Sequence, residues 1–230
     1  MSLRCGYYGL SPLERDTYRL RANTSGTRDT LDHWRRRASR KDPDQAVMSA
    51  RYTVEQNRIA TARVQGEISR FAMDVLGESR ALEFGYGTGR MTQFLARYAN
   101  LVVGVDFCPE MTARATARLS GVDNVALHTG RLYEMGFLPR AFGVGFIFTI
   151  LAHILDDAEL KGVVNSLKSS ASRILIGEDV GGGYDRERSV WTRLRPVRDY
   201  VELFYPCRLT RFHETHQAND PIALMLFEPK

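Results

Sequence analysis

Three glycines at alternate positions, flanked by two acids, have the spacing in this sequence that most directly indicates chemistry. The glycines are Gly85, Gly87 and Gly89, and the acids are Glu83 and Asp106. Glycine lets the backbone take a positive φ and approach a ligand closely. An acid at the tip of the following strand is placed to accept both hydroxyls of a ribose. The pattern therefore predicts a nucleoside site.

The segments around these residues have the pattern of a strand, a turn, a helix and a second strand. A short apolar run over 81–84 suits a buried parallel strand, and a second run over 101–105 ends at Asp106. Between them, apolar residues recur at helical spacing, at Met91, Phe94, Leu95 and Tyr98. Because a right-handed crossover makes such a unit compact, we expect the nucleoside across the carboxyl ends of both strands.

The exact glycine spacing separates one cofactor class from another. A dinucleotide fingerprint has its third glycine three positions after the second, and that position holds Arg90. The third glycine is instead Gly89, one residue earlier. Glu83 would repel a pyrophosphate, but it can orient the glycine loop and face a cationic amino-acid group. The alternatives are a Rossmann-like oxidoreductase and a fold that has lost its ligand.

The segments L-E-F-G-Y-G-T-G-R and V-V-G-V-D-F-C-P-E-M resemble motif I and its successor in the class I S-adenosylmethionine-dependent methyltransferases. The resemblance covers about 82–160, and the C-terminal part more loosely. It implies a three-layer α/β/α Rossmann-like fold, with a seven-stranded, mostly parallel sheet and a C-terminal antiparallel hairpin. It also implies S-adenosyl-L-methionine as cofactor and S-adenosyl-L-homocysteine as product. The cofactor-binding residues it implies are Glu83, Gly85, Tyr86, Gly87, Gly89, Asp106, Phe107, Met111, Arg131, Leu132 and Thr149.

Two positions depart from the family pattern. Family members commonly have an acid after the third strand, which binds the adenine amino group, whereas this chain has Thr129-Gly130-Arg131-Leu132. That contact is then missing or made by the backbone, and Arg131 could instead face an anionic acceptor. Most relatives also have an acid where Gly143 stands.

The composition is that of an ordinary globular protein: 43% of the 230 residues are hydrophobic and 26% are charged. A net charge of +5 favours anionic partners without requiring nucleic acid. The longest nearly apolar run, over 141–155, is too short to span a bilayer, and no signal peptide is evident. The three cysteines lack metal-ligand spacing. We therefore expect a cytoplasmic monomer or homodimer without a membrane segment or a metal.

Residues 1–78 are expected to form a helical extension packed on a methyltransferase core at 79–230. Helices are predicted near Ser11, over 27–38 and over 45–76, the last with a possible bend in its first half. By the resemblance, such helices close over the cofactor and shape the acceptor pocket, which makes Trp34 and Tyr52 candidate lid residues. The alternative is that Trp34 only anchors the extension. The further strands are expected at 125–128, 142–149, 172–177, 207–213 and 222–227, with a short helix at 198–204.

His153 is the candidate general base, because it follows the fourth strand at the sheet edge where the methyl group would lie. Histidine titrates near the working pH of most enzymes. The alternative is a structural histidine that binds backbone at the strand end. His213 and His216, with Glu214 between them, could form a second acid–base group or simply lie on a surface strand.

An arginine-rich stretch lies within an expected acceptor-specific insertion at about 181–204. Arg193 and Arg195 could bind a carboxylate or phosphate of a small acceptor through forked hydrogen bonds. They could also form a solvated helix face paired with Asp185, Glu187 and Asp199.

Methyl transfer from a sulfonium is an in-line displacement for which the cofactor supplies the electrophile. The sequence therefore predicts transfer to an oxygen or nitrogen of a small-molecule acceptor, with an anionic acceptor and a role in natural-product or sugar biosynthesis as options. One compact domain without an appended nucleic-acid module favours a small acceptor. The alternatives are an RNA or protein methyltransferase that uses the basic N-terminal helices, and a non-catalytic S-adenosylmethionine-binding regulatory module.

Overall fold

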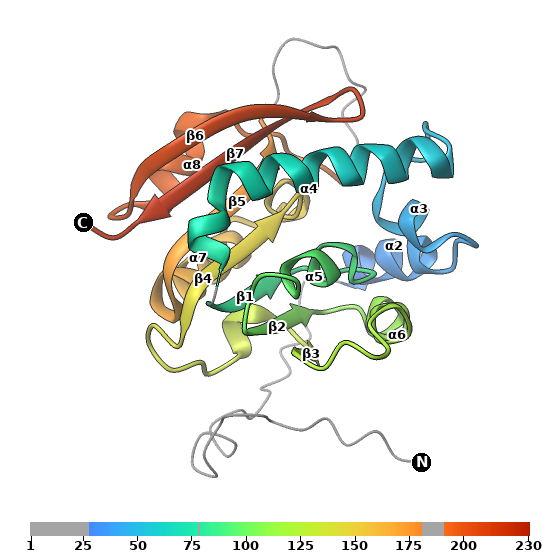
Figure 1. Cartoon of the computed structure of the whole chain (residues 1–230), viewed down its shortest axis with the longest axis horizontal. Coiled ribbons are helices and arrows are strands. Elements are labelled where there is room, and N and C mark those ends of the chain that lie inside the picture. The colour runs from blue at the N-terminus through green and yellow to red at the C-terminus, as the bar shows by residue number, and fades with distance from the viewer. Residues whose placement is uncertain (1–27, 78, 181–190) are drawn as a thin grey trace.

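A seven-stranded sheet in the order β3-β2-β1-β4-β5-β7-β6 forms the centre of the molecule (Figure 1). The computed structural model describes residues 28–77, 79–180 and 191–230. The first five strands are parallel, and β7 and β6 form an antiparallel hairpin beside β5. The strands are β1 (Arg80–Phe84), β2 (Leu101–Asp106), β3 (Val125–Thr129), β4 (Phe142–Phe148), β5 (Ala171–Asp179), β6 (Arg208–Gln217) and β7 (Asp220–Glu228). The expected sheet is confirmed.

Helices cover both faces of this sheet. Apolar side chains of α4 (Val54–Leu76) and α5 (Arg90–Leu95) pack on one face, where Val64, Ile68 and Phe94 are buried. Those of α7 (Asp157–Ser170) and α8 (Val197–Phe204) pack on the other. Because side chains on the central strands are buried on both faces, those strands are nearly continuous apolar runs.

The predicted helix over 45–76 is wrong, because the structure divides it in two. Asp42 caps α3 (Pro43–Val47), because its side chain accepts hydrogen bonds from the backbone N–H groups of Asp44 and Gln45. The second helix, α4, begins after Thr53, and the side chains of Thr53 and Gln56 form a capping box at its N-terminus. The non-helical residue inside α4 is Ala72, near its end and not in its first half.

The N-terminal helix α2 (Arg28–Ala38) lies beside α3 and α6 (Pro109–Arg118), next to the carboxyl ends of β1 and β2 (Figure 1). The helix predicted near Ser11 lies outside the described residues, as does much of the expected insertion. No helix among the described residues is long and apolar enough to cross a membrane.

The C-terminal hairpin is longer than its predicted strands. Both strands extend by several residues toward the turn at 218–219, where Gln217 pairs with Asp220. The sequence of β6 past His213 is polar because most of this edge strand faces solvent. Apolar character therefore could not mark where the strand ends.

Candidate active site

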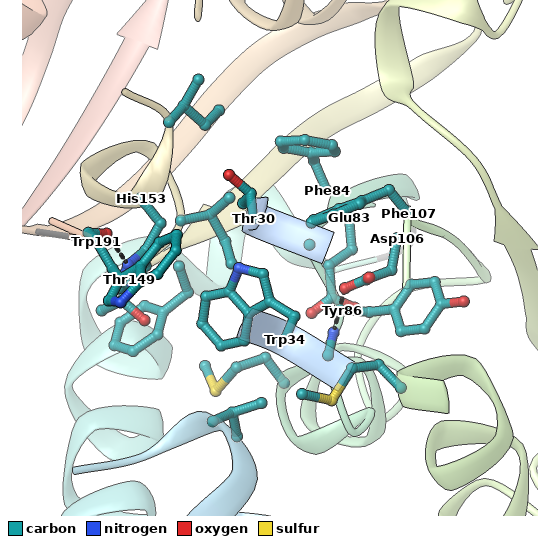
Figure 2. Close-up of a pocket in the computed structure, with 18 of the residues that line it drawn as sticks. Thr30, Trp34, Glu83, Phe84, Tyr86, Asp106, Phe107, Thr149, His153 and Trp191 are labelled. Carbon is teal, nitrogen blue, oxygen red and sulfur yellow. Dashed lines mark hydrogen bonds between the residues drawn. The ribbon is translucent and has the colours of Figure 1, made fainter. Parts of the chain in front are cut away.

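A cavity of about 350 Å³ lies at the carboxyl ends of β1, β2 and β4 (Figure 2). Parallel register brings those ends level, since Phe84 pairs with both Val105 and Ile147. The glycine turn after β1 forms part of its wall, and Trp34 from α2 lies across it. Residues distant in sequence thus meet in one site.

The glycine turn requires glycine for two separate reasons. Gly85 and Gly87 have φ values of 74° and 53°, in the left-handed region that side chains disfavour. A Cβ on Gly85 would also lie 2.6 Å from Ile150, and one on Gly87 would lie 2.7 Å from Val47. The turn is therefore closed in by side chains and leaves its backbone facing the cavity.

Asp106 fixes this turn from the neighbouring strand. Its Oδ2 accepts a hydrogen bond from the Gly87 N–H at 2.9 Å, and its Oδ1 accepts one from the Cys108 N–H at 2.9 Å. Burial raises its pKa to about 6, although both hydrogen bonds oppose that shift. A carboxylate has further lone pairs, so Asp106 can still accept hydrogen bonds from ligand hydroxyls.

Glu83 is the most unusual group in the cavity. It is 2% exposed, and its Oε2 has no hydrogen-bond partner among the described residues. Burial raises its pKa to about 8, and the nearby Thr92 hydroxyl and the charge of Arg90 act in the opposite direction. A buried polar atom left without a partner indicates a missing ligand group. A hydrogen-bond donor or a cation would satisfy it.

His153 lies at the other side of Trp34 from Asp106, in the short 3₁₀ turn η2 (Leu151–His153) (Figure 2). Its Nδ1 is 3.0 Å from the carbonyl oxygen of Trp191, and its ring meets the Trp34 ring edge to face at 5.1 Å. Because a carbonyl only accepts, Nδ1 carries the proton and Nε2 keeps its lone pair. Burial lowers the pKa of His153, which keeps the ring neutral.

A buried acid and a buried arginine form hydrogen bonds with the backbone of the turn that carries His153. Glu178, at the end of β5, accepts hydrogen bonds from the N–H groups of Ile150 at 2.9 Å and Leu151 at 2.8 Å. Arg195 donates to the carbonyls of Leu151 and Ile154 at 2.7 and 2.9 Å. Burial raises the pKa of Glu178 to about 7.

Eight further predicted residues fall into two groups, those that line the cavity and those that do not. Tyr86, Phe107, Met111, Thr149 and Trp34 line the cavity with Gly85 and Gly87. Gly89 begins α5, Leu132 is buried in the core, and Arg131 pairs with Glu159 and lies over the Phe107 ring. These last three are not among the residues that line the cavity.

The residues expected to bind the acceptor are only partly brought together. Tyr52 lies against the Arg51 guanidinium and does not line the cavity. Arg193 pairs with Asp157 at 2.9 Å on the surface, and Arg195 is the buried backbone donor described above. Of the expected arginine partners, Asp185 and Glu187 lie outside the described residues, and Asp199 pairs with Arg198.

The second histidine group lies away from this site. His213 and His216 lie on the edge strand β6 and are exposed, and the His213 Nε2 is 3.2 Å from Glu67 on α4. Neither lines the cavity. Among the described residues, no group of three or more histidines, cysteines or acids could hold a metal ion.

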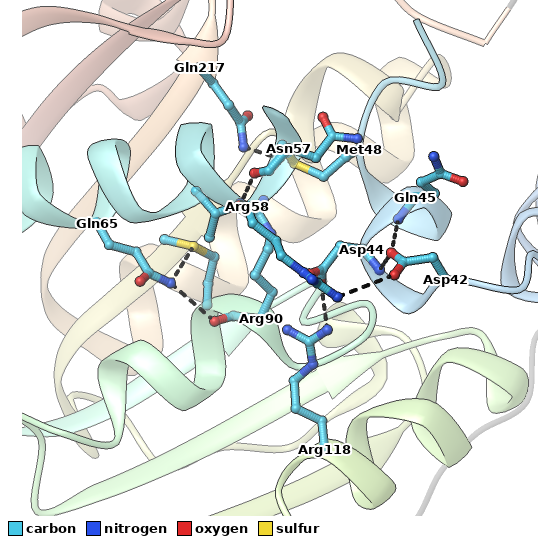
Figure 3. Close-up of polar contacts among 12 residues, drawn as sticks. Asp42, Asp44, Gln45, Met48, Asn57, Arg58, Gln65, Arg90, Arg118 and Gln217 are labelled. Carbon is cyan, nitrogen blue, oxygen red and sulfur yellow. Dashed lines mark hydrogen bonds and ion pairs between the residues drawn. The ribbon is translucent and has the colours of Figure 1, made fainter. Parts of the chain in front are cut away.

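Polar contacts attach the N-terminal helices to the core beside the cavity (Figure 3). Asp44 of α3 pairs with Arg118 of α6, and both side chains are mostly buried. Gln65 of α4 donates to the Arg90 carbonyl at 3.4 Å, and Gln217 of β6 lies 3.0 Å from the Met48 sulfur. The extension therefore packs on the core through several elements.

Sequence reasoning missed several lining residues: Thr30, Arg90, Asp156, Glu159 and Trp191. Arg90 follows the glycine turn directly and was noticed only as the residue that breaks the dinucleotide pattern. Trp191 follows undescribed residues and reaches the site through long-range packing. Only Asp156, expected as a helix cap, had a local signal, and its side chain does accept from the Glu159 N–H.

The profile of a methyltransferase domain matches residues 81–171. No curated protein sequence matches the chain significantly. Among solved structures, the N-methyltransferase NodS from Bradyrhizobium japonicum WM9, in complex with S-adenosyl-L-homocysteine, is 14% identical with a TM-score of 0.68, over 87% of this chain and 98% of that one. An S-adenosylmethionine-dependent methyltransferase of Leishmania major is 17% identical with a TM-score of 0.69, over 87% and 82%.

Phosphoethanolamine N-methyltransferase 1 of Haemonchus contortus, in complex with phosphoethanolamine and S-adenosylhomocysteine, is 14% identical with a TM-score of 0.67. That match covers 91% of this chain and 50% of the other. At such identities the likeness concerns the fold. Residues 81–171 are therefore a methyltransferase domain, and the chain has the fold of the class I S-adenosylmethionine-dependent methyltransferases.

Proposed function

We propose that this protein transfers the methyl group of S-adenosyl-L-methionine to an oxygen or nitrogen of a small-molecule acceptor, releasing S-adenosyl-L-homocysteine. The observation that carries the proposal is the buried, partnerless Oε2 of Glu83 in the same cavity as Asp106 and His153. Two of the three neighbouring structures named above hold S-adenosylhomocysteine, which supports this cofactor.

The residues present fit the cofactor. Asp106 would accept hydrogen bonds from the ribose hydroxyls, and Phe107 and Met111 would lie against the adenine. Glu83 would face the positively charged amino-acid end, which supplies the donor that its Oε2 lacks. When bound, the cofactor supplies a methyl group on a positively charged sulfur.

His153 would remove the proton of the acceptor. Its Nε2 has a free lone pair because the Trp191 carbonyl holds the proton on Nδ1. A neutral imidazole in the cavity is the form of histidine that can act as a base. A positioned base of this kind accelerates transfer by roughly 10²–10⁴-fold.

The size and cover of the cavity favour a small acceptor over RNA or protein. A cavity of about 350 Å³ is at the small end of ligand pockets, and Trp34 and Trp191 border it. Natural-product or sugar modification remains the proposed setting. An anionic acceptor loses its support, because Arg193 and Arg195 bind Asp157 and backbone carbonyls respectively.

Calorimetry with S-adenosylmethionine and S-adenosylhomocysteine tests the proposal. Both are expected to bind, and Asp106→Ala is expected to weaken them by about 100-fold, since hydrogen bonds to a charged group contribute about 1.5–3 kcal/mol each. Asp106→Asn keeps the size of the side chain and separates lost charge from lost packing. Asp74→Asn, which removes an exposed acid paired with Arg211, is the matched control. Failure of both ligands to bind, or unchanged affinity in Asp106→Ala, would contradict the proposal.

A further inference from the structure

Four aromatic rings from three parts of the chain gather near the end of the cavity opposite Asp106, and Figure 2 labels those of Trp34, His153 and Trp191. The rings of Trp34 and His153 meet edge to face at 5.1 Å, and those of His33 and Trp191 stack at 4.6 Å. His33 and Trp34 meet at 5.3 Å, which joins the two pairs. Trp34, His153 and Trp191 all line the cavity. Electron-rich ring faces of this kind attract ammonium groups.

The charged residues that line the cavity also favour a positively charged ligand. The described lining contains four acids, Glu83, Asp106, Asp156 and Glu159, and one arginine, Arg90. Asp156 is at the head of α7, three residues after His153. Arg90 is at the glycine turn, where it donates to the Thr61 hydroxyl at 3.0 Å. Glu159 pairs with Arg131, which lies over the Phe107 ring. The lining that follows the His153 turn therefore includes an acid, Asp156, together with the rings.

The arginines near this end are held by other groups. Arg37 lies 5.4 Å from the Trp34 ring centroid, but it donates to the carbonyls of Ala46 and Met48 and does not line the cavity. Arg131 pairs with Glu159. Arg195 donates to Leu151 and Ile154. A carboxylate or phosphate on the acceptor would thus meet Asp156 at this end, while each of these three arginines is already engaged by another group.

We propose that the acceptor is an amine, held as its ammonium form by Trp34, Trp191 and Asp156 and methylated on nitrogen. This inference rests on the proposed function and names its substrate class. The reaction first moves one proton from the ammonium to Nε2 of His153, which frees the nitrogen lone pair. That lone pair forms the N–C bond to the methyl group while the C–S bond breaks and its electrons return to sulfur. The products are a methylated ammonium, neutral S-adenosylhomocysteine and one proton released from His153 to solvent.

Three probes with the same ring and similar length test whether the site prefers a cation, an anion or a neutral group: phenethylamine, hydrocinnamate and hydrocinnamyl alcohol. Each is titrated by calorimetry into protein saturated with S-adenosylhomocysteine. The amine is expected to bind about tenfold more tightly than the other two, the scale of a desolvated cation–π contact. Equal binding of the three, tighter binding of the carboxylate, or no binding of the amine would overturn the inference. If S-adenosylhomocysteine itself does not bind, the proposed function fails instead.

Paired substitutions locate the binding site of the amine. Asp156→Asn removes the charge but keeps a side chain that caps α7, and it is expected to weaken the amine several-fold. Asp157→Asn makes the same change one residue away, outside the lining, and is expected to leave amine binding unchanged. Trp34→Leu is expected to weaken amine binding about tenfold, and Trp34→Phe is expected to weaken it less. Unaltered S-adenosylhomocysteine affinity checks folding in each variant, and equal effects of Asp156→Asn and Asp157→Asn would contradict the site.

Discussion

The protonation of His153 is set by its neighbours. Its Nδ1 proton is fixed by the Trp191 carbonyl, and burial lowers its pKa, so the ring can accept a proton at neutral pH. The carbonyl belongs to Trp191, 38 positions further along the chain. The histidine is thus prepared for one role by contacts that a local stretch of sequence does not contain.

His153→Asn tests that role. Asparagine can still donate to the Trp191 carbonyl, so the turn should keep its shape, but the base is lost. We expect kcat to fall by about 10²–10³-fold while S-adenosylmethionine affinity changes by less than about twofold. Initial rates at saturating cofactor, with calorimetry in parallel, measure both quantities. Unchanged kcat would assign His153 a structural role only.

For individual residues, the sequence was informative about the site where a residue's place depends on local spacing. The positive φ values of Gly85 and Gly87 and the place of Asp106 follow from a turn of fixed length between two strands. Arg195 shows the limit, because its partners are more than 40 positions away and it was expected to bind a ligand or face solvent. A buried arginine that satisfies carbonyls has no local pattern to mark it.

Among the elements, the turn η2 depends on one strand, β5, and on the segment before α8. Glu178 satisfies N–H groups at the start of the turn, and Arg195 satisfies carbonyls at its end. Since both side chains are buried, neither can be replaced by water without rearrangement. The position of His153 is therefore set by β5 and by the segment before α8.

Arg195→Met should destabilise the protein and displace the base. Leaving the Leu151 and Ile154 carbonyls unsatisfied is expected to lower the free energy of unfolding by about 2–3 kcal/mol, and kcat should fall with it. Arg193→Met removes an exposed ion pair nearby and should change stability by less than about 0.5 kcal/mol. Urea unfolding and initial rates compare the two variants. Equal stability of both would show that the buried contacts do not hold the turn.

Element boundaries were less predictable than element order. The break between α3 and α4 was missed, although Thr53 and Gln56 form a capping pair that the sequence displays. The predicted helix began at residue 45 and so included Ala46, which is buried in a different cluster from the apolar residues of α4. Periodicity alone could not show that two helices pack on different surfaces.

For the whole molecule, three buried acids at one edge of the sheet determine how stability responds to pH. Burial raises the pKa of Glu83 to about 8, of Glu178 to about 7 and of Asp106 to about 6. The folded protein keeps protons that the unfolded chain releases at its ordinary values of 4.5 for Glu and 3.8 for Asp. Buried His33, His128 and His153 have lowered pKa values and act in the opposite direction below their ordinary value of 6.5. Above that value the acids act alone, so the free energy of unfolding should fall as pH rises from about 6.5 to about 8.

Thermal unfolding of the ligand-free protein should therefore show a Tm that decreases between about pH 6.5 and about pH 8. Glu83→Gln cannot ionise, so its Tm should decrease less over this interval and exceed that of the natural protein at the upper end. The same variant should bind S-adenosylmethionine more weakly. Glu202→Gln changes an exposed acid and serves as control. A natural Tm that rises with pH would contradict the assignment.

The antiparallel hairpin at one edge of the sheet supports the cavity without contributing to its lining. β7 lies directly beside β5, and Ala223 pairs with Glu178 in the ladder. No residue of β6 or β7 lines the cavity. β7 nevertheless keeps in line the strand whose carboxylate anchors the histidine turn, so under the proposed function we expect methyl transfer to depend on strands that contact neither reactant.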